Sequence, residues 1–241
     1  MQIKTKAFAL SYIKYSEKDI IAKIYTRELG LQSYLVRGVF KQKSKNKIYA
    51  FEPFTFLELD VYYKESKQLN YIKELKIHDT NSVINADFIK KSIALMLSEV
   101  FIKTVKEEEP NEELFEFIEA AFSFYYAQSS YPEFHLQFLS IFTKFLGVNP
   151  INNYHQQEKS FFDIKEGCFV AQKPILHNLY MMPDAAYYFS EYLKSGINNS
   201  SKLQNAAQRK QMLFHLINYY KNHVEGFSDL KSLDILTEVL V

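Results

Sequence analysis

Aromatic and β-branched residues recur in short runs along the first third of the chain, and turn residues separate these runs. The pattern is typical of β-strands. Five runs are present, at about residues 4–14, 19–27, 32–37, 54–63 and 69–78. In the fourth run Leu57, Leu59 and Val61 alternate with two acids and a tyrosine, so we expect this strand to have one solvated face.

The connections between these runs indicate how the strands pair. Between the second and third runs lies Gly30, a residue that adopts positive φ without steric cost, as a tight hairpin requires. No helical segment separates the runs, so the strands are expected to be antiparallel. Five short antiparallel strands in about 75 residues favour a closed five-stranded barrel of OB type. An SH3-like barrel is the alternative.

After Asn81 the hydrophobic period changes from 2 to 3.6, which predicts helices. The predicted apolar stripes are Ile89, Ile93, Met96, Leu97 and Val100; Leu114, Phe117, Ile118, Ala121 and Tyr125; Phe134, Phe138, Ile141, Phe142 and Phe145; Leu213, Leu216, Ile217 and Tyr220; and Leu233, Leu236, Val239 and Leu240. The acids at 112, 113, 116 and 119 are expected to face away from the core. Residues 150–182 look irregular, with a short hairpin at about 161–171. The predicted fold is therefore β + α in two domains, an OB-type barrel at 1–80 and a helical domain at 81–241.

Composition places the chain among ordinary globular proteins, because hydrophobic residues make up 47% and charged residues 24%. The single cysteine, Cys168, has no partner for an internal disulfide. The longest apolar run is far shorter than the roughly 20 residues of a membrane helix. We therefore expect a cytoplasmic protein with no membrane association.

Charge is distributed unevenly, although the net charge is only +1. Residues 1–80 contain 15 basic and 9 acidic side chains, whereas residues 81–241 contain 14 and 19. A basic domain joined to an acidic one is expected when only the first faces phosphates, because nucleic-acid affinity depends strongly on cations that replace condensed counterions. The alternative is a chance distribution.

The basic side chains are densest between the third and fourth predicted strands. Five cations occur there in eleven residues with no acid among them: Arg37, Lys41, Lys43, Lys45 and Lys47. Such a loop is expected to follow a sugar-phosphate backbone without reading bases, since a lysine ammonium is a point charge. A solvated loop without a ligand is the alternative interpretation.

Three other residues of the predicted barrel are candidates for DNA contact. Arg27 ends a strand, where its guanidinium could clamp a phosphate or equally pair with a neighbouring carboxylate. Tyr34 and Tyr62 are candidate stacking platforms for unpaired bases. Most of the 21 Phe and 18 Tyr are expected to be core residues.

Catalytic patterns are missing from the sequence. It contains no GxxxxGK[ST], GxGxxG, GxSxG or HExxH motif, so phosphate-loop, dinucleotide, esterase and zincin chemistry lack support. His155, Cys168 and His177 have spacings that match no close-paired zinc ligands. We expect a protein that is not an enzyme.

Several motifs resemble the RecO family of bacterial recombination mediators. They are Lys6-Ala-Phe-Ala-Leu10, the run from Asp19 to Tyr25, Thr26-Arg27-Glu28-Leu-Gly30, Val36-Arg37-Gly38-Val39 and Pro53-Phe-Thr-Phe-Leu-Glu58, with weaker similarity at Leu216–His223 and Leu230–Leu233. The resemblance implies an N-terminal OB-fold and a helical C-terminal domain. It also implies a protein of DNA repair and homologous recombination, in the RecF pathway, that binds single- and double-stranded DNA and anneals complementary strands.

The resemblance implies partners as well. They are RecR, with which the protein would help to load RecA, the C-terminal tail of single-stranded DNA-binding protein, and indirectly RecF and RecA. An acidic tail with an apolar end would need an apolar groove with a cation at its rim. When engaged, the protein would lie at the nucleoid.

The sequence departs from the family in the region of its zinc module. Many members carry two cysteine pairs there, whereas residues 149–186 contain only Cys168. We therefore expect no cofactor and a degenerate, metal-free insert at about 150–182, held by Phe161, Phe162, Phe169 and Ile175.

Two further functions remain open at this point. One is an RNA-binding OB-fold protein with a helical dimerisation domain. The other is a protein-interaction adaptor whose basic loop only confers solubility.

Overall fold

The computed structural model describes residues 1–41, 48–64, 69–78, 87–106, 109–156, 158–197, 203 and 205–239. The chain forms two compact units, Met1–Phe122 and Ser123–Val241. Across the described residues, no helix combines the length and the apolar character needed to cross a membrane.

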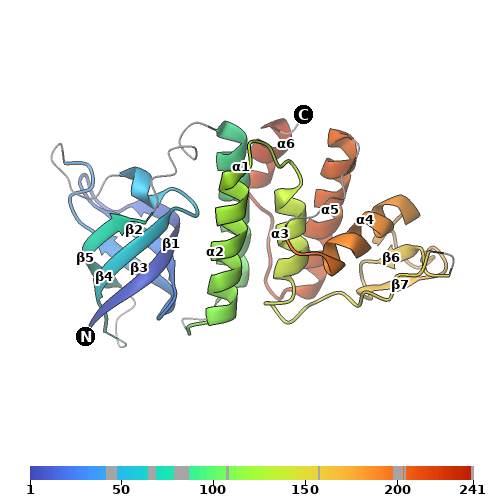
Figure 1. Cartoon of the computed structure of the whole chain (residues 1–241), viewed down its shortest axis with the longest axis horizontal. Coiled ribbons are helices and arrows are strands. Elements are labelled where there is room, and N and C mark those ends of the chain that lie inside the picture. Colours follow the sequence, from blue (N-terminus) through green and yellow to red (C-terminus); the bar gives the residue numbers. More distant parts are fainter. Residues whose placement is uncertain are drawn as a thin grey trace. The chain divides into compact units, whose positions relative to one another are not determined.

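The first unit begins with a closed five-stranded barrel (Figure 1). Its strands are β1 (Gln2–Lys14), β2 (Ile20–Thr26), β3 (Gly30–Val36), β4 (Phe56–Tyr62) and β5 (Asn70–Ile77). The order around the barrel is β1-β2-β3-β5-β4, and only β3 and β5 pair in parallel. All five predicted strands are confirmed within two residues at each end, and the OB-type barrel is confirmed.

Strand β1 closes the barrel because it is long enough to pair on both edges. Its first half pairs with β4 from Gln2 to Phe8, and its second half pairs with β2 from Ala7 to Lys14. The register with β2 shifts between Ala9 and Ser11, which marks a β-bulge. A bulge bends and twists a strand, and this allows one strand to serve both halves of a closed barrel.

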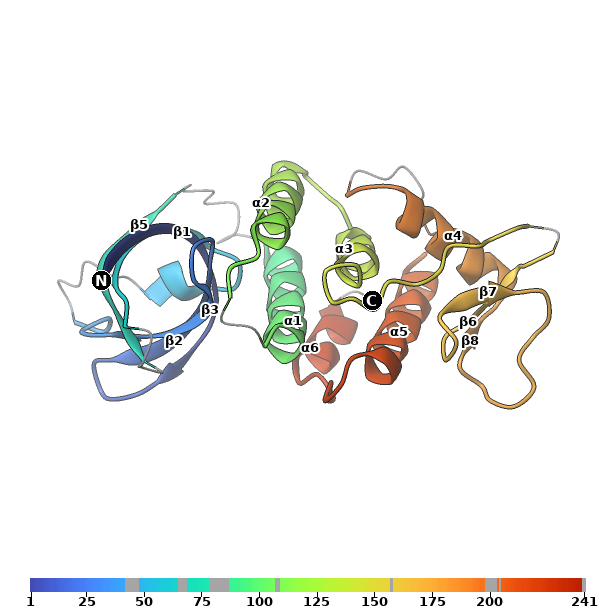
Figure 2. The same cartoon turned by 90° about the horizontal axis from the view of Figure 1, so that it is seen from below.

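Small side chains of β1 fill the barrel interior, where Ala7 and Ala9 are fully buried. Tyr34 on β3 is also fully buried there. The 3-10 helix η1 (Ile48–Phe51) adds Ala50 and Phe51 to the same core and lies across the ring of strands in Figure 2.

The opposite face of β1 packs against α1 (Phe88–Thr104) and against the first part of α2 (Glu112–Ala127), which belongs to the same unit up to Phe122. Phe8, Leu10 and Tyr25 are buried. The ring centres of Phe8 and Phe115 lie 5.2 Å apart, and those of Tyr25 and Phe101 lie 4.9 Å apart. Aromatic pairs of this kind stabilise beyond the area that they bury.

Phe54 has the only positive φ, 56°, among the described residues other than glycine. Its N–H donates to Ala9 O at 2.7 Å, and its ring stacks on Phe122 with 3.9 Å between centres. A large side chain tolerates this strained backbone only where its surroundings hold it. The strain thus places an aromatic ring from the barrel against α2.

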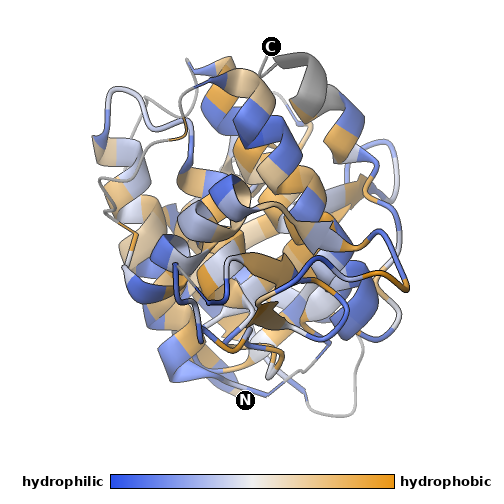
Figure 3. Cartoon of the chain, turned by 90° about the vertical axis from the view of Figure 1, so that its right-hand side faces the viewer, coloured by the Kyte–Doolittle hydropathy of each residue, from blue (hydrophilic) through white to orange (hydrophobic). Residues whose placement is uncertain are grey.

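The second unit contains helices α3 (Phe134–Phe142), α4 (Pro183–Lys194), α5 (Ala206–His223) and α6 (Ser232–Val239). A small sheet of β6 (Phe161–Asp163), β7 (Cys168–Val170) and β8 (Tyr180–Met181), in the order β7-β6-β8, accompanies them. Figure 3 shows its hydrophobic strands in front. Phe162 packs on Phe169, with 4.9 Å between ring centres, and on Phe189 of α4, with 4.8 Å.

Five details of the sequence-based prediction were wrong. The five strands were expected to be antiparallel, whereas β3 and β5 pair in parallel. Helix α4 was not predicted. The helical domain contains a three-stranded sheet, since β8 joins the predicted hairpin. Ile89 is 45% exposed and not part of the core stripe. Ile175 is 94% exposed and so does not help to hold the insert together as predicted, whereas Phe162 and Phe169 are buried as expected.

The boundary after residue 80 stays a prediction. The first compact unit extends to Phe122, because α1 and the first part of α2 pack on the barrel.

His135 on α3 is fully buried, and neither ring nitrogen has a hydrogen-bond partner among the residues that the structure describes. Burial, together with the nearby charge of Arg209, lowers the pKa of His135 to about 3. The native state therefore keeps this imidazole neutral, while the unfolded chain takes up a proton below a pH of about 6.5.

We predict that this histidine reduces stability in mild acid. Between a pH of about 6.5 and one near 3, the free energy of unfolding should fall by about 1.4 kcal/mol per pH unit from this group. His135→Leu should remove that dependence while leaving stability at pH 7 similar or higher. Urea unfolding at pH 7 and pH 5 measures the difference, which is expected to be about 2 kcal/mol larger for the native sequence than for the variant. Equal losses in both proteins would contradict the prediction.

Candidate nucleic-acid interface

The basic loop begins at a tight turn from Gly38 to Lys41 that immediately follows β3. The Lys41 N–H donates to Gly38 O at 3.1 Å, and Gly38 has φ of +69°. A Cβ at this position would lie 3.1 Å from Lys41 Cδ, so glycine suits both the backbone conformation and the space.

This turn is held by the loop between β1 and β2. The Gly38 N–H donates to Asp19 Oδ1 at 2.8 Å, and the Phe40 N–H approaches Lys18 O at 3.5 Å. The hydrogen bond from Gly38 is the main cause that lowers the pKa of Asp19, with help from Ser16 and from the charges of Arg37 and Lys41. An ionised Asp19 therefore anchors the start of the basic loop at neutral pH.

Arg37 and Lys41 are exposed beside this anchor. Lys43, Lys45 and Lys47 lie outside the described residues, so their assignment to DNA stays a prediction. Two aromatic side chains flank the same turn, since Tyr15 is 61% exposed and Phe40 is 48% exposed. The two loops together, residues 15–19 and 37–41, thus combine cations with exposed rings.

One row of cross-strand partners on the barrel contains the exposed residues Ile13, Tyr62 and Tyr71, together with the partly buried Ile21 and the buried Leu35, and we call it the outer row. It consists of Ile13, Ile21, Leu35, Tyr71 and Tyr62, each paired with the next in the register of β1, β2, β3, β5 and β4. Partners directly opposite one another lie on the same face of a sheet. Tyr62 is 50% exposed and Tyr71 is 36% exposed. Two adjacent tyrosine rings are therefore accessible on this face.

Arg37 connects the outer row to the basic loop. Its guanidinium carbon lies 5.5 Å from the centre of the Tyr71 ring, which is within cation–π range. This contact places a planar cation beside both exposed tyrosines. The arrangement suits a phosphate next to a stacked base.

The amide side chains of β3 and β5 point inward, away from the outer row. Asn70 Nδ2 donates to Gln32 Oε1 at 3.2 Å, and both residues are buried. Asn and Gln are the side chains best suited to pairing with adenine edges. Because these two bond to each other inside the barrel, they are withdrawn from base readout.

The structure corrects two of the predicted site residues. Tyr34 pairs with Ala22 and Asn70 on the inner face and is fully buried, so its assignment as a stacking platform was wrong. Arg27 forms ion pairs with Glu112 and, at 3.2 Å, with Glu116 on α2. Of the two roles considered for Arg27, it has the carboxylate pairing, and Glu112 and Glu116 are exposed, as expected for acids that face away from the helical core.

The sequence analysis missed Tyr71, Tyr15 and Phe40. The signal for Tyr71 is the alternation of the last strand, in which Tyr71 and Lys73 are exposed while Asn70 is buried. The signal for Phe40 is its position in the turn Arg37-Gly-Val-Phe-Lys41, beside two cations.

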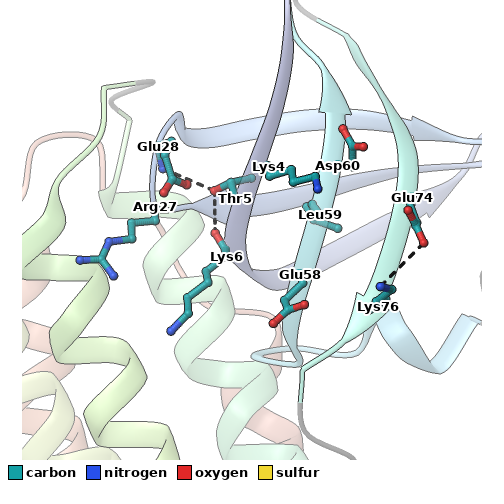
Figure 4. A pocket seen from close by; sticks show the side chains of 10 residues that line it. All are labelled: Lys4, Thr5, Lys6, Arg27, Glu28, Glu58, Leu59, Asp60, Glu74 and Lys76. Atoms are coloured by element: carbon teal, nitrogen blue, oxygen red, sulfur yellow. Dashed lines mark hydrogen bonds and ion pairs between the residues drawn. The ribbon is translucent and has the colours of Figure 1, made fainter.

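A pocket of about 440 Å³ lies on another part of the barrel wall, against β1, β4 and β5 (Figure 4). Four basic and four acidic side chains line it, so its formal charge is zero. Figure 4 shows Arg27 extending away from Lys76, on the side of α2. A balanced lining of this kind does not attract a polyanion, so this pocket is a poorer candidate than the outer row.

The segment of the family's zinc module does not fit a zinc centre. Among the described residues no group of three or more His, Cys, Asp or Glu could hold a metal ion. Cys168 is partly exposed, and burial together with Asp163 raises the pKa of its thiol.

Comparison with known proteins identifies the family. A family model described as Recombination protein O N terminal matches residues 1–81, and one described as Recombination protein O C terminal matches residues 85–234. The chain belongs to the RecO family. Relatives named DNA repair protein RecO include those of Flavobacterium psychrophilum, 37% identical over 241 residues, and Flavobacterium johnsoniae, 35% identical over 241 residues, each covering 99% of both chains. The RecO of Bacteroides fragilis is 30% identical over 239 residues and covers 98% of both chains. Membership of the RecO family, expected from the barrel motifs, is confirmed.

The two arginines of the RecO-type barrel give a matched pair for testing the interface. Arg37→Ala should reduce the slope of log affinity against log salt for a single-stranded oligonucleotide by about one ion, because Arg37 is exposed beside the basic loop. Arg27→Ala should leave the slope unchanged, because carboxylates of α2 already neutralise its charge. Fluorescence anisotropy at several salt concentrations measures both slopes. Equal changes in the two variants would contradict this assignment of the interface.

Proposed function

We propose that the chain is a mediator of DNA repair and homologous recombination that acts by binding DNA and not as an enzyme. It binds single- and double-stranded DNA with the basic loop, contacts single strands also with the outer row, anneals complementary strands, and helps to load RecA together with RecR. The observation that carries this proposal is the group of Arg37, Lys41 and exposed tyrosines on the barrel of a RecO-family chain.

Annealing follows from the charges of this surface. Two DNA strands repel one another through their phosphates, and this repulsion opposes their encounter. Lysine and arginine side chains that replace condensed counterions lower the repulsion without selecting a sequence. A surface with cations, whose neighbouring amides at Gln2, Gln32 and Asn70 are hydrogen-bonded to other side chains, therefore suits annealing of any complementary pair.

The relatives' names support the repair role, since each is called a DNA repair protein. We propose RecR, the C-terminal tail of single-stranded DNA-binding protein and, indirectly, RecF and RecA as partners on the strength of family membership. We also propose that the protein works in the cytoplasm, at the nucleoid, and without a metal cofactor.

The basic loop gives the first test of this function. Replacing Lys41, Lys43, Lys45 and Lys47 by Ala should flatten the salt slope for single-stranded DNA by up to about three units, since each phosphate contact contributes about 0.7. Annealing of complementary oligonucleotides should slow in parallel. The control replaces four exposed lysines of the second unit, Lys144, Lys165, Lys173 and Lys210, and should anneal normally. If both variants anneal like the native protein, the loop is not the DNA site.

An annealing assay in the presence of single-stranded DNA-binding protein separates the proposed function from the alternatives. A recombination mediator anneals DNA strands covered by that protein. An RNA-binding protein would prefer RNA of the same sequence and would not anneal covered DNA. A protein-interaction adaptor would bind neither nucleic acid.

A further inference from the structure

The outer row has a chemical property that the basic loop lacks. Lysines interact with phosphates whether the bases are paired or not, whereas an aromatic ring can stack only on a base whose face is accessible. Tyr62 and Tyr71 are cross-strand partners with half and about a third of their surface exposed. Adjacent strands lie about 4.8 Å apart, so the two rings are neighbours on one face.

The surroundings of these rings favour bases as their occupant. Arg37 contacts the ring of Tyr71 and supplies a positive charge for the adjoining phosphate. The row itself contains no carboxylate, and its other members are Ile13, Ile21 and Leu35. Apolar and aromatic side chains beside a planar cation are the usual components of a platform for single strands.

The amides beside the row are engaged in other hydrogen bonds. Gln2 of β1 is the other cross-strand partner of Tyr62, and its Nε2 donates to Asp60 Oδ2 at 2.7 Å. The neighbouring amides, Asn70 and Gln32, bond to each other inside the barrel. A base that stacks by its face on Tyr62 or Tyr71 therefore keeps its Watson–Crick edge free. This geometry suits a strand that is held and is still able to pair.

We propose that the outer row is a stacking site for unpaired bases, centred on Tyr62 and Tyr71, which gives the barrel its preference for single strands and presents their Watson–Crick edges to a complementary strand. This inference rests on the proposed DNA-binding function and refines it. The basic loop binds both forms of DNA, and the tyrosines distinguish between them.

A tryptophan reporter tests the contact directly, because the native chain contains no Trp. Tyr71→Trp introduces a single indole into the row, and its emission should be quenched when oligothymidylate binds. An abasic strand of equal length, which has the same phosphates without bases, should bind more weakly and leave the emission unchanged. Tyr187→Trp places the control indole on an exposed position of α4, 45% exposed in the native residue, and should respond to neither strand.

Two double variants test the proposed preference for single-stranded over double-stranded DNA. Tyr62→Ala with Tyr71→Ala should weaken binding of oligothymidylate about tenfold or more and leave duplex affinity and the salt slope unchanged. Tyr62→Phe with Tyr71→Phe keeps both rings and should bind like the native protein. Circular dichroism checks that all variants fold. Equal losses for single strands and duplex, or an alanine variant that binds like the phenylalanine variant, would overturn the inference.

Annealing at a saturating protein concentration tests whether the Watson–Crick edges of the bound bases stay free. With the native protein, two complementary strands that are both fully bound should anneal at least as fast as at half saturation. Inhibition at saturation would show that the bound bases are masked and would overturn that part of the proposal. If the native protein bound abasic and normal strands equally, with a steep salt slope, the stacking site would fail while DNA binding stood. If it bound neither strand, the proposed function itself would fail.

Discussion

Closure of the barrel through β1 is the constraint on which the rest of the first unit depends. One strand pairs with β4 along its first half and with β2 along its second, and the bulge between Ala9 and Ser11 allows it to do both. Once that register is set, each side chain of the barrel strands faces either the interior of the barrel or its outside. Ala7 and Ala9 fill the interior, Phe8 and Leu10 turn to the helices, and the partners of Ile13 form the outer row. A slip by one residue would exchange these faces.

The strands and the barrel were predictable from the sequence because period-2 patterns and turn residues are local signals. The direction of Tyr34 was not, because β3 has no charged residue to mark a solvated face, and Tyr34, Leu35 and Val36 are all buried. Only the pairing of Tyr34 with Ala22 and Asn70 places it inside the barrel. Tyr71 could have been assigned from the local pattern, because it lies two residues from Lys73 and shares its face of β5.

Ion pairs over long sequence distances explain the other error at the site. Arg27 and the acids of α2 are 85 and 89 residues apart, so the sequence left open whether Arg27 binds a phosphate or pairs with a carboxylate. Helix α4 was missed for a related reason. Its buried side chains include Ser190 and Tyr192 as well as Ala186 and Phe189, while Tyr187 is exposed, so tyrosine lies on both faces and the helix is less hydrophobic on average than α1, α2 and α3. Tertiary packing, and not the local sequence pattern, determines both the ion pairs of Arg27 and the formation of helix α4.

The two kinds of contact that we propose for the barrel, ionic and stacking, have complementary physical limits. Point charges act over about a Debye length and need no particular geometry, so they attract strands from solution. Salt weakens this attraction, and it does not distinguish paired from unpaired bases. Stacking acts only at contact and is insensitive to charge, so it can select an exposed base. A protein that brings two strands together needs both properties on one surface, and it must also release the product. Once the bases pair, their faces stack on one another within the duplex and are no longer available to Tyr62 and Tyr71. Pairing itself therefore removes the contact that distinguishes substrate from product.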